Sequence, residues 1–94
     1  MEERNYLISL YDYYGLLLTL KQQEYFEDYY FENLTMEEIA DNDKISKNAV
    51  SKQIKIIKEK LYSYEDTLKC FYKRNKILSI IKDKDLIDKI DKYI

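Results

Sequence analysis

The sequence contains no histidine and no proline, and it has a single glycine and a single cysteine. Histidine is the commonest acid–base group and metal ligand in proteins, so its absence removes the usual starting point for catalysis. One cysteine, Cys70, can form no disulfide within the chain and cannot build a zinc site without histidine. No glycine-rich loop is present to bind phosphates. We therefore expect no enzymatic activity, no metal and no cofactor, and a reducing, cytoplasmic location.

Signals for strands and for export are also missing. No segment alternates cleanly between apolar and polar residues, and no Asn-Gly or Asp-Gly pair marks a hairpin. The chain opens with Glu2 and Glu3 rather than with the basic start of a secretory signal, and no apolar run approaches the ~20 residues that span a bilayer. Without proline, long helices meet few interruptions. We therefore predict that residues 1–94 form one all-helical domain that does not insert into a membrane.

The most informative stretch, residues 34–61, has the pattern of a helix-turn-helix. Thr35, with Glu38 three positions later, has the capping-box spacing that opens a helix. Asn42–Asp43 breaks the pattern, because both side chains compete for backbone hydrogen bonds. Ser46 then caps a second helix. The apolar residues of that helix follow one another at spacings of four, three and four and so share a face: Val50, Ile54, Ile57 and Leu61.

Two apolar positions fit a tight turn between these helices. Ala40 lies where the first helix would cross the second, and a close crossing needs a small side chain there. Ile45 directly precedes the Ser46 cap, where an apolar residue can staple the turn to the core. Both residues therefore favour two helices packed at close range.

The outward face of the second helix is polar and basic. In a helix-turn-helix this face enters a major groove and reaches base edges and phosphates. Asn48 and Ser51 are the best candidates for contacts with bases. The predicted nucleic-acid-binding residues are Lys44, Lys47, Asn48, Ser51, Lys52, Lys55 and Lys58. The alternative is an ordinary helical hairpin whose lysine face is only solvated.

The net charge of −2 conceals a strong separation of charge along the chain. Residues 1–43 carry −9, residues 44–82 carry +8 and residues 83–94 carry −1. The positive charge begins at the turn and follows the second helix. This distribution is typical of a face that binds a polyanion.

Helical segments flank the helix-turn-helix on both sides. Residues 3–33 predict an N-terminal pair of helices, the second of which begins after the cap Thr19 and turns acidic residues outward. The first helix, residues 3–18, repeats apolar residues at three and four positions: Leu7, Leu10, Tyr14 and Leu17. Residues 62–94 form a C-terminal helical extension that ends in a short amphipathic helix, capped by Asp83 or Asp85, with Leu86, Ile87, Ile90 and Ile94 on one face.

The extension continues the apolar repeat of the second helix. A three–four spacing runs from Ile54 to Leu78 and includes Asn75 at a core-type position, where asparagine fixes register in coiled coils. One hypothesis is a homodimer formed through residues 61–81. The alternative is a break near Ser63, after which the chain folds back over the N-terminal helices.

Several motifs, in this order, resemble the YlxM family of small helix-turn-helix proteins, which are themselves similar to region 4 of bacterial sigma factors. They cover most of the chain from residue 6 to about residue 70. The matching motifs are LYDYY (10–14), LTLKQ (18–22), YFEDYY (25–30), LTMEEIA (34–40) and ISKNAV (45–50).

This resemblance implies a fold without a wing and with long C-terminal helices. It also implies a link to the signal recognition particle, through the RNA or the protein of that particle. The chain departs from the pattern at Lys44, where glycine or asparagine is common, and lysine in a left-handed conformation would cost roughly 1 kcal/mol. We expect a nucleic-acid-binding regulatory protein that binds DNA or this RNA. The alternative is an adaptor that makes protein contacts through its C-terminal helices.

Overall fold

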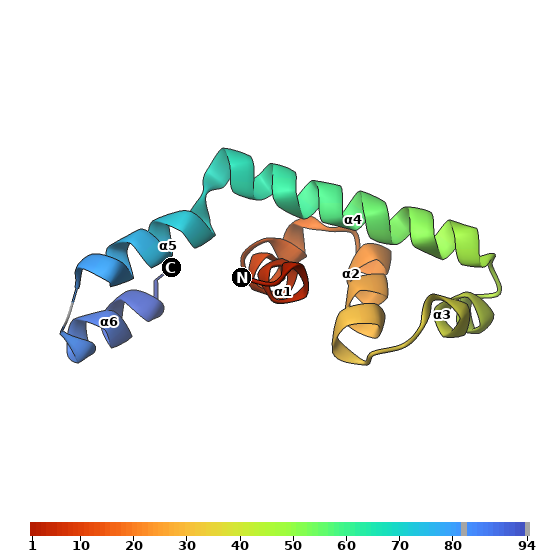
Figure 1. Cartoon of the computed structure of the whole chain (residues 1–94), viewed down its shortest axis with the longest axis horizontal. Helices are drawn as coiled ribbons and strands as arrows, with labels where there is room; N and C mark the ends of the chain where they lie inside the picture. Colours follow the sequence, from red (N-terminus) through yellow and green to blue (C-terminus); the bar gives the residue numbers. More distant parts are fainter. Residues whose placement is uncertain (82, 94) are drawn as a thin grey trace.

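The computed structural model describes residues 1–81 and 83–93, and the regular structure in these residues is entirely helical, which confirms the predicted fold class. The long helix α4 lies along one side of the molecule, α1, α2 and α3 pack beneath it, and α5 and α6 extend beyond its C-terminal end (Figure 1). In these residues we find no helix long and apolar enough to cross a membrane. The elements are α1 (Glu3–Tyr14), the 3-10 helix η1 (Gly15–Leu17), α2 (Leu20–Phe26), the π-helix η2 (Glu27–Phe31), α3 (Met36–Asp43), α4 (Lys47–Leu68), α5 (Cys70–Ile80) and α6 (Lys84–Asp91).

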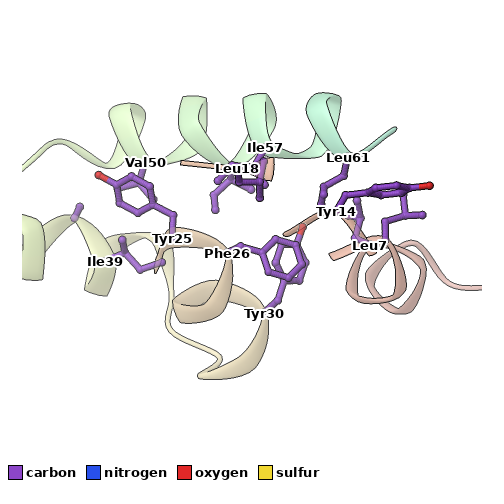
Figure 2. Packing of buried hydrophobic residues seen from close by; sticks show 13 residues of the cluster. Leu7, Tyr14, Leu18, Tyr25, Phe26, Tyr30, Ile39, Val50, Ile57 and Leu61 are labelled. Atoms are coloured by element: carbon purple, nitrogen blue, oxygen red, sulfur yellow. The ribbon is translucent and has the colours of Figure 1, made fainter. Parts of the chain in front are cut away.

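The core forms along the apolar face of α4. This face packs on the buried sides of α1, α2, η2 and α3 (Figure 2). The side chains that α4 contributes are those predicted from the sequence: Val50, Ile54, Ile57 and Leu61. The side chains that face them are at most 6% exposed: Leu7, Leu10, Tyr14, Leu18, Tyr25, Phe26, Tyr30, Ile39 and Ala40.

The end of the first helix differs from the prediction. Leu17 was expected on the buried face, but it is 55% exposed, and Leu18 is buried in its place. The cause is the change from α-helix to 3-10 helix at Gly15, which rotates the following side chains. A Cβ at Gly15 would lie 2.9 Å from the ring of Tyr11, which is stacked on Phe26, so this turn has little room for a larger residue.

The helix starts follow the predicted capping residues. Thr35 Oγ1 accepts the N–H of Glu38 at 3.1 Å, and Glu38 Oε1 accepts the N–H of Thr35 at 3.1 Å, which completes the capping box. Thr19 caps α2 in the same way, Ser46 caps α4 and Asp83 caps α6. Ile94, which the sequence placed on the apolar face of the last helix, lies outside the described residues.

The C-terminal part breaks at a position that neither sequence-based alternative anticipated. Helix α4 continues past Ser63 to Leu68, and Lys69 then adopts a positive φ of 55° before α5 begins. Helix α5 turns towards α1, where Phe71 packs edge-on against Tyr6 with ring centroids 5.3 Å apart. Asn75 is exposed in the single chain.

The turn of the helix-turn-helix is closed by two backbone hydrogen bonds. Lys44 has a φ of 57°, its N–H donates to the carbonyl of Asp41 at 3.4 Å, and the N–H of Ile45 donates to the carbonyl of Ala40 at 3.0 Å. This is the arrangement in which glycine normally ends a helix. Lys44 thus adopts the left-handed conformation whose steric cost was considered from the sequence. The expected staple is not found: Ile45 is 37% exposed and does not pack on the core.

Replacing Lys44 by glycine should stabilise the protein, because glycine adopts a positive φ without the steric cost that lysine has. We expect Lys44→Gly to raise the free energy of unfolding by about 0.5–1 kcal/mol in urea titrations followed by circular dichroism. The matched control Lys52→Gly lies inside α4 and should lower it by about 0.5–1 kcal/mol. A loss of stability in Lys44→Gly would contradict the conformation described at this turn.

Candidate nucleic-acid interface

The position of α4 is fixed by its crossing with α3. Ala40 of α3 and Val50 of α4 are both buried, so the two helices approach closely at the N-terminal end of α4. The side chain of Ser46 accepts the N–H of Ala49 at 3.1 Å and begins the helix there. Because these contacts hold its inner face, the outer face of the first turns of α4 projects into solvent.

Six of the seven predicted nucleic-acid-binding residues are exposed. They follow the turn and the first three turns of α4, which brings them to one end of the molecule: Lys44, Lys47, Asn48, Ser51, Lys52 and Lys55. Within residues 1–81 and 83–93, no ion pair or side-chain hydrogen bond engages Asn48, Ser51, Lys52 or Lys55. These four side chains are therefore available to an external ligand.

Lys47 is engaged by an acidic residue that the sequence did not single out. Its Nζ lies 2.9 Å from Oε1 of Glu37, in the first turn of α3. The hydrogen bond from Lys47, together with its positive charge, lowers the pKa of Glu37 below the usual carboxylate value. Glu37 therefore stays ionised at neutral pH and places a negative charge beside the basic face.

Lys58 is less exposed than the other six residues. It is partly buried, and its Nζ donates to Oε1 of Glu3 at 3.1 Å, which links α4 to the start of α1. Lys58 lies only three residues after Lys55, roughly 4.5 Å along the helix axis. Lys58 therefore adjoins the six exposed residues, but its contact with Glu3 holds it against α1.

Arg4 is a further basic residue near this end that sequence reasoning missed. One guanidinium nitrogen, Nη2, donates to the carbonyl of Tyr30 and to Oδ1 of Asn33, each at 2.6 Å. Arg4 also lines a cavity of about 400 Å³ together with Thr35 and Lys47. The feature of the sequence that could have singled out Arg4 is the rarity of arginine, since only two arginines occur in the chain. Arg4 therefore ties α1 to the segment that leads into α3.

Comparison with known proteins agrees with this architecture. The model of the family UPF0122, described as "Putative helix-turn-helix protein, YlxM / p13 like", matches residues 1–93. A UPF0122 protein of Ureaplasma parvum is 42% identical over 91 residues, which cover 94% of this chain and 92% of the relative. A UPF0122 protein of Clostridium perfringens is 37% identical over 102 aligned positions, which cover all of this chain and 91% of the relative. The resemblance found in the sequence is thereby confirmed: the chain belongs to the UPF0122 family of YlxM / p13-like helix-turn-helix proteins.

Proposed function

We propose that this protein is a cytoplasmic regulatory protein that binds nucleic acid by inserting the first turns of α4 into a major groove. One observation carries this proposal: Asn48, Ser51, Lys52 and Lys55 are exposed, make no ion pair or side-chain hydrogen bond with the described part of the chain, and lie on the outer face of a helix that packs on α3. A recognition helix needs this combination of rigid support and unengaged polar groups.

The side chains at this end suit different roles in the complex. Asn48 and Ser51 are short and uncharged, and their donors and acceptors suit the edges of bases. Lys52 and Lys55 carry charge on long side chains, and Lys44 lies at the turn beside them, so these three suit phosphates. Lys47 reaches a phosphate only when it leaves Glu37.

Membership of the YlxM-like family extends the proposal to the signal recognition particle, with its RNA or its protein as a second partner. The positive charge of residues 44–82 suits any polyanion. The major groove of A-form RNA is deep and narrow, so α4 could not enter it as it enters that of B-form DNA. An RNA complex would therefore rest on contacts between the lysines and phosphates outside the groove.

The C-terminal helices suit a protein partner, and we propose a homodimer formed through residues 61–81. No residue of α5 or α6 is buried in the single chain. Leu68, a member of the three–four repeat, is 45% exposed, and Ile80, two residues beyond the end of that repeat, is 71% exposed. If α4 proves not to bind nucleic acid, these helices carry the alternative function of an adaptor.

Reversing two charges of α4 should abolish most of the affinity for nucleic acid. We expect Lys52→Glu combined with Lys55→Glu to weaken binding to duplex DNA at least tenfold and to lower the salt slope by about 1.8, since each phosphate contact contributes about 0.9. The measurement is a titration at several salt concentrations, with duplex DNA and the RNA of the particle side by side. The control, Lys73→Glu with Lys76→Glu, makes the same charge change on α5 and should alter binding little. Equal effects of the two double variants would refute the assignment to α4.

Removing the charge of Glu37 should strengthen binding, because a carboxylate beside the interface repels phosphate and holds Lys47 back. We expect Glu37→Gln to raise the affinity for duplex DNA about two- to fivefold, the size that exposed ion pairs allow. It should also steepen the salt slope by about 0.9 as Lys47 reaches a phosphate. Glu32→Gln makes the same charge change in the linker before α3 and serves as control. An unchanged affinity and slope in Glu37→Gln would show that Lys47 lies outside the interface.

The proposed homodimer predicts a molecular mass twice the 11.5 kDa of the chain. Light scattering at micromolar concentration measures this mass directly. Ile77→Asp with Ile80→Asp should return the protein to 11.5 kDa, because a buried charge without a partner is strongly unfavourable. Leu16→Asp, at an apolar position in η1 that is more exposed than either, should leave the dimer intact. A monomer in the unaltered protein contradicts this part of the proposal.

A further inference from the structure

The joint between α4 and α5 consists of Lys69 alone. Its φ of 55° lies in the left-handed region, which L side chains disfavour, and its N–H donates to the carbonyl of Glu65 at 2.8 Å. A helix that continued through this point would hold Lys69 in the ordinary right-handed conformation. The bend therefore depends on contacts that favour the start of α5 in its present place.

Two buried side chains supply these contacts. Glu65 Oε1 accepts the N–H of Phe71 at 3.2 Å, and Glu65 Oε2 accepts the N–H of Tyr72 at 3.0 Å. The hydroxyl oxygen of Tyr14, in α1, accepts the N–H of Cys70 at 3.0 Å. The same hydroxyl donates to Glu65 Oε1 at 2.5 Å, so the two side chains act together. Glu65 is only 8% exposed, although it carries a carboxylate.

A straight arrangement would satisfy the same backbone groups in another way. In a continuous helix the three N–H groups of residues 70–72 would donate to the carbonyls of residues 66–68, four positions earlier. Three hydrogen bonds to side chains are thus exchanged for three hydrogen bonds to the backbone. The bent form is favoured by the packing of Phe71 on Tyr6. The straight form is favoured because it avoids the steric cost of a positive φ at Lys69. Such a near balance is the basis of two-state elements in proteins.

The sequence is compatible with both arrangements. No glycine or proline occurs between α4 and the end of α5, and the three–four repeat crosses the joint from Leu61 through Leu68 to Leu78, with Asn75 as its polar member. In the bent form this repeat is divided, since α5 and α6 turn away from the axis of α4 (Figure 1). In a straight form Leu68 would lie in line with its neighbours on both sides.

We propose that Tyr14 and Glu65 form a latch that holds α5 and α6, the C-terminal arm, bent against α1. Release of the latch straightens α4 and α5 into one helix and extends the apolar seam that would face a second copy. The latch acts through the conformation at Lys69. The position of the arm does not depend on nucleic-acid binding, so the latch can fail or stand independently of that function; its consequence for the seam rests on the proposed homodimer.

Spin labels on α1 and α5 measure the position of the arm. Asn5→Cys and Lys76→Cys are exposed labelling sites, introduced together with Cys70→Ser so that no other thiol reacts. In the otherwise unaltered chain, diluted with excess unlabelled protein so that distances between two copies do not contribute, pulsed electron resonance should give one short distance. Glu65→Gln should add a longer distance and raise the ratio of straight to bent molecules about tenfold, because hydrogen bonds to a charged group are lost. Tyr14→Phe should act in the same direction to a smaller extent.

Lys69→Gly provides the decisive second variant. Glycine favours the positive φ of the bend and disfavours a helix interior, so adding it to Glu65→Gln should restore the short distance. Asp66→Asn, the neighbouring exposed carboxyl, should leave the distance unchanged. The latch is refuted if Glu65→Gln gives the same distances as Asp66→Asn, or if Lys69→Gly fails to restore the bend. If the circular dichroism of Glu65→Gln shows that this variant has lost its helices, Tyr14→Phe replaces it in the comparison with Asp66→Asn and in the combination with Lys69→Gly.

Discussion

The burial of one face of α4 is the constraint on which the rest of this structure depends. Val50, Ile54, Ile57 and Leu61 supply most of what α1, α2 and α3 pack against, and those three helices are too short to be stable alone. Each buried aliphatic side chain of this size contributes about 1.5–3 kcal/mol. Because the inner face is fixed so strongly, the rotation of α4 about its axis is fixed too, and with it the direction of every outer side chain.

The same helix separates the charges of the molecule. Eleven of the eighteen acidic residues precede residue 44, whereas residues 44–82, from the turn through α4 and α5, carry a net charge of +8, which creates a local positive field on a chain that is acidic overall. Two contacts moderate this field, since Glu37 engages Lys47 and Glu3 engages Lys58. Between these two contacts, from Asn48 to Lys55, α4 makes no ion pair with the described part of the chain. This concentrates any recognition in the first turns of the helix.

Features set by neighbours three or four positions apart could be predicted from the sequence: the helical class, the capping residues, the buried face of α4 and the exposure of most of its basic residues. Features set by distant contacts could not. The burial of Leu18 follows from a local change of helix type, and the pairing of Glu37 with Lys47 follows from how α3 crosses α4. The bend at Lys69 has no local signal, because the hydroxyl of Tyr14, far away in the sequence, helps to hold it.

The length of α4 has a further consequence for how two partners could share this molecule. Its 22 residues make a rod roughly 33 Å long, whereas the major groove is about 8.5 Å deep. If α4 entered the groove by its N-terminal end, only its first turns would fit within that depth, and its other end would stand clear of the duplex. A protein seated on α5 and α6 would therefore meet no steric obstacle from DNA, and the chain could act as a spacer that holds two macromolecules at a set separation.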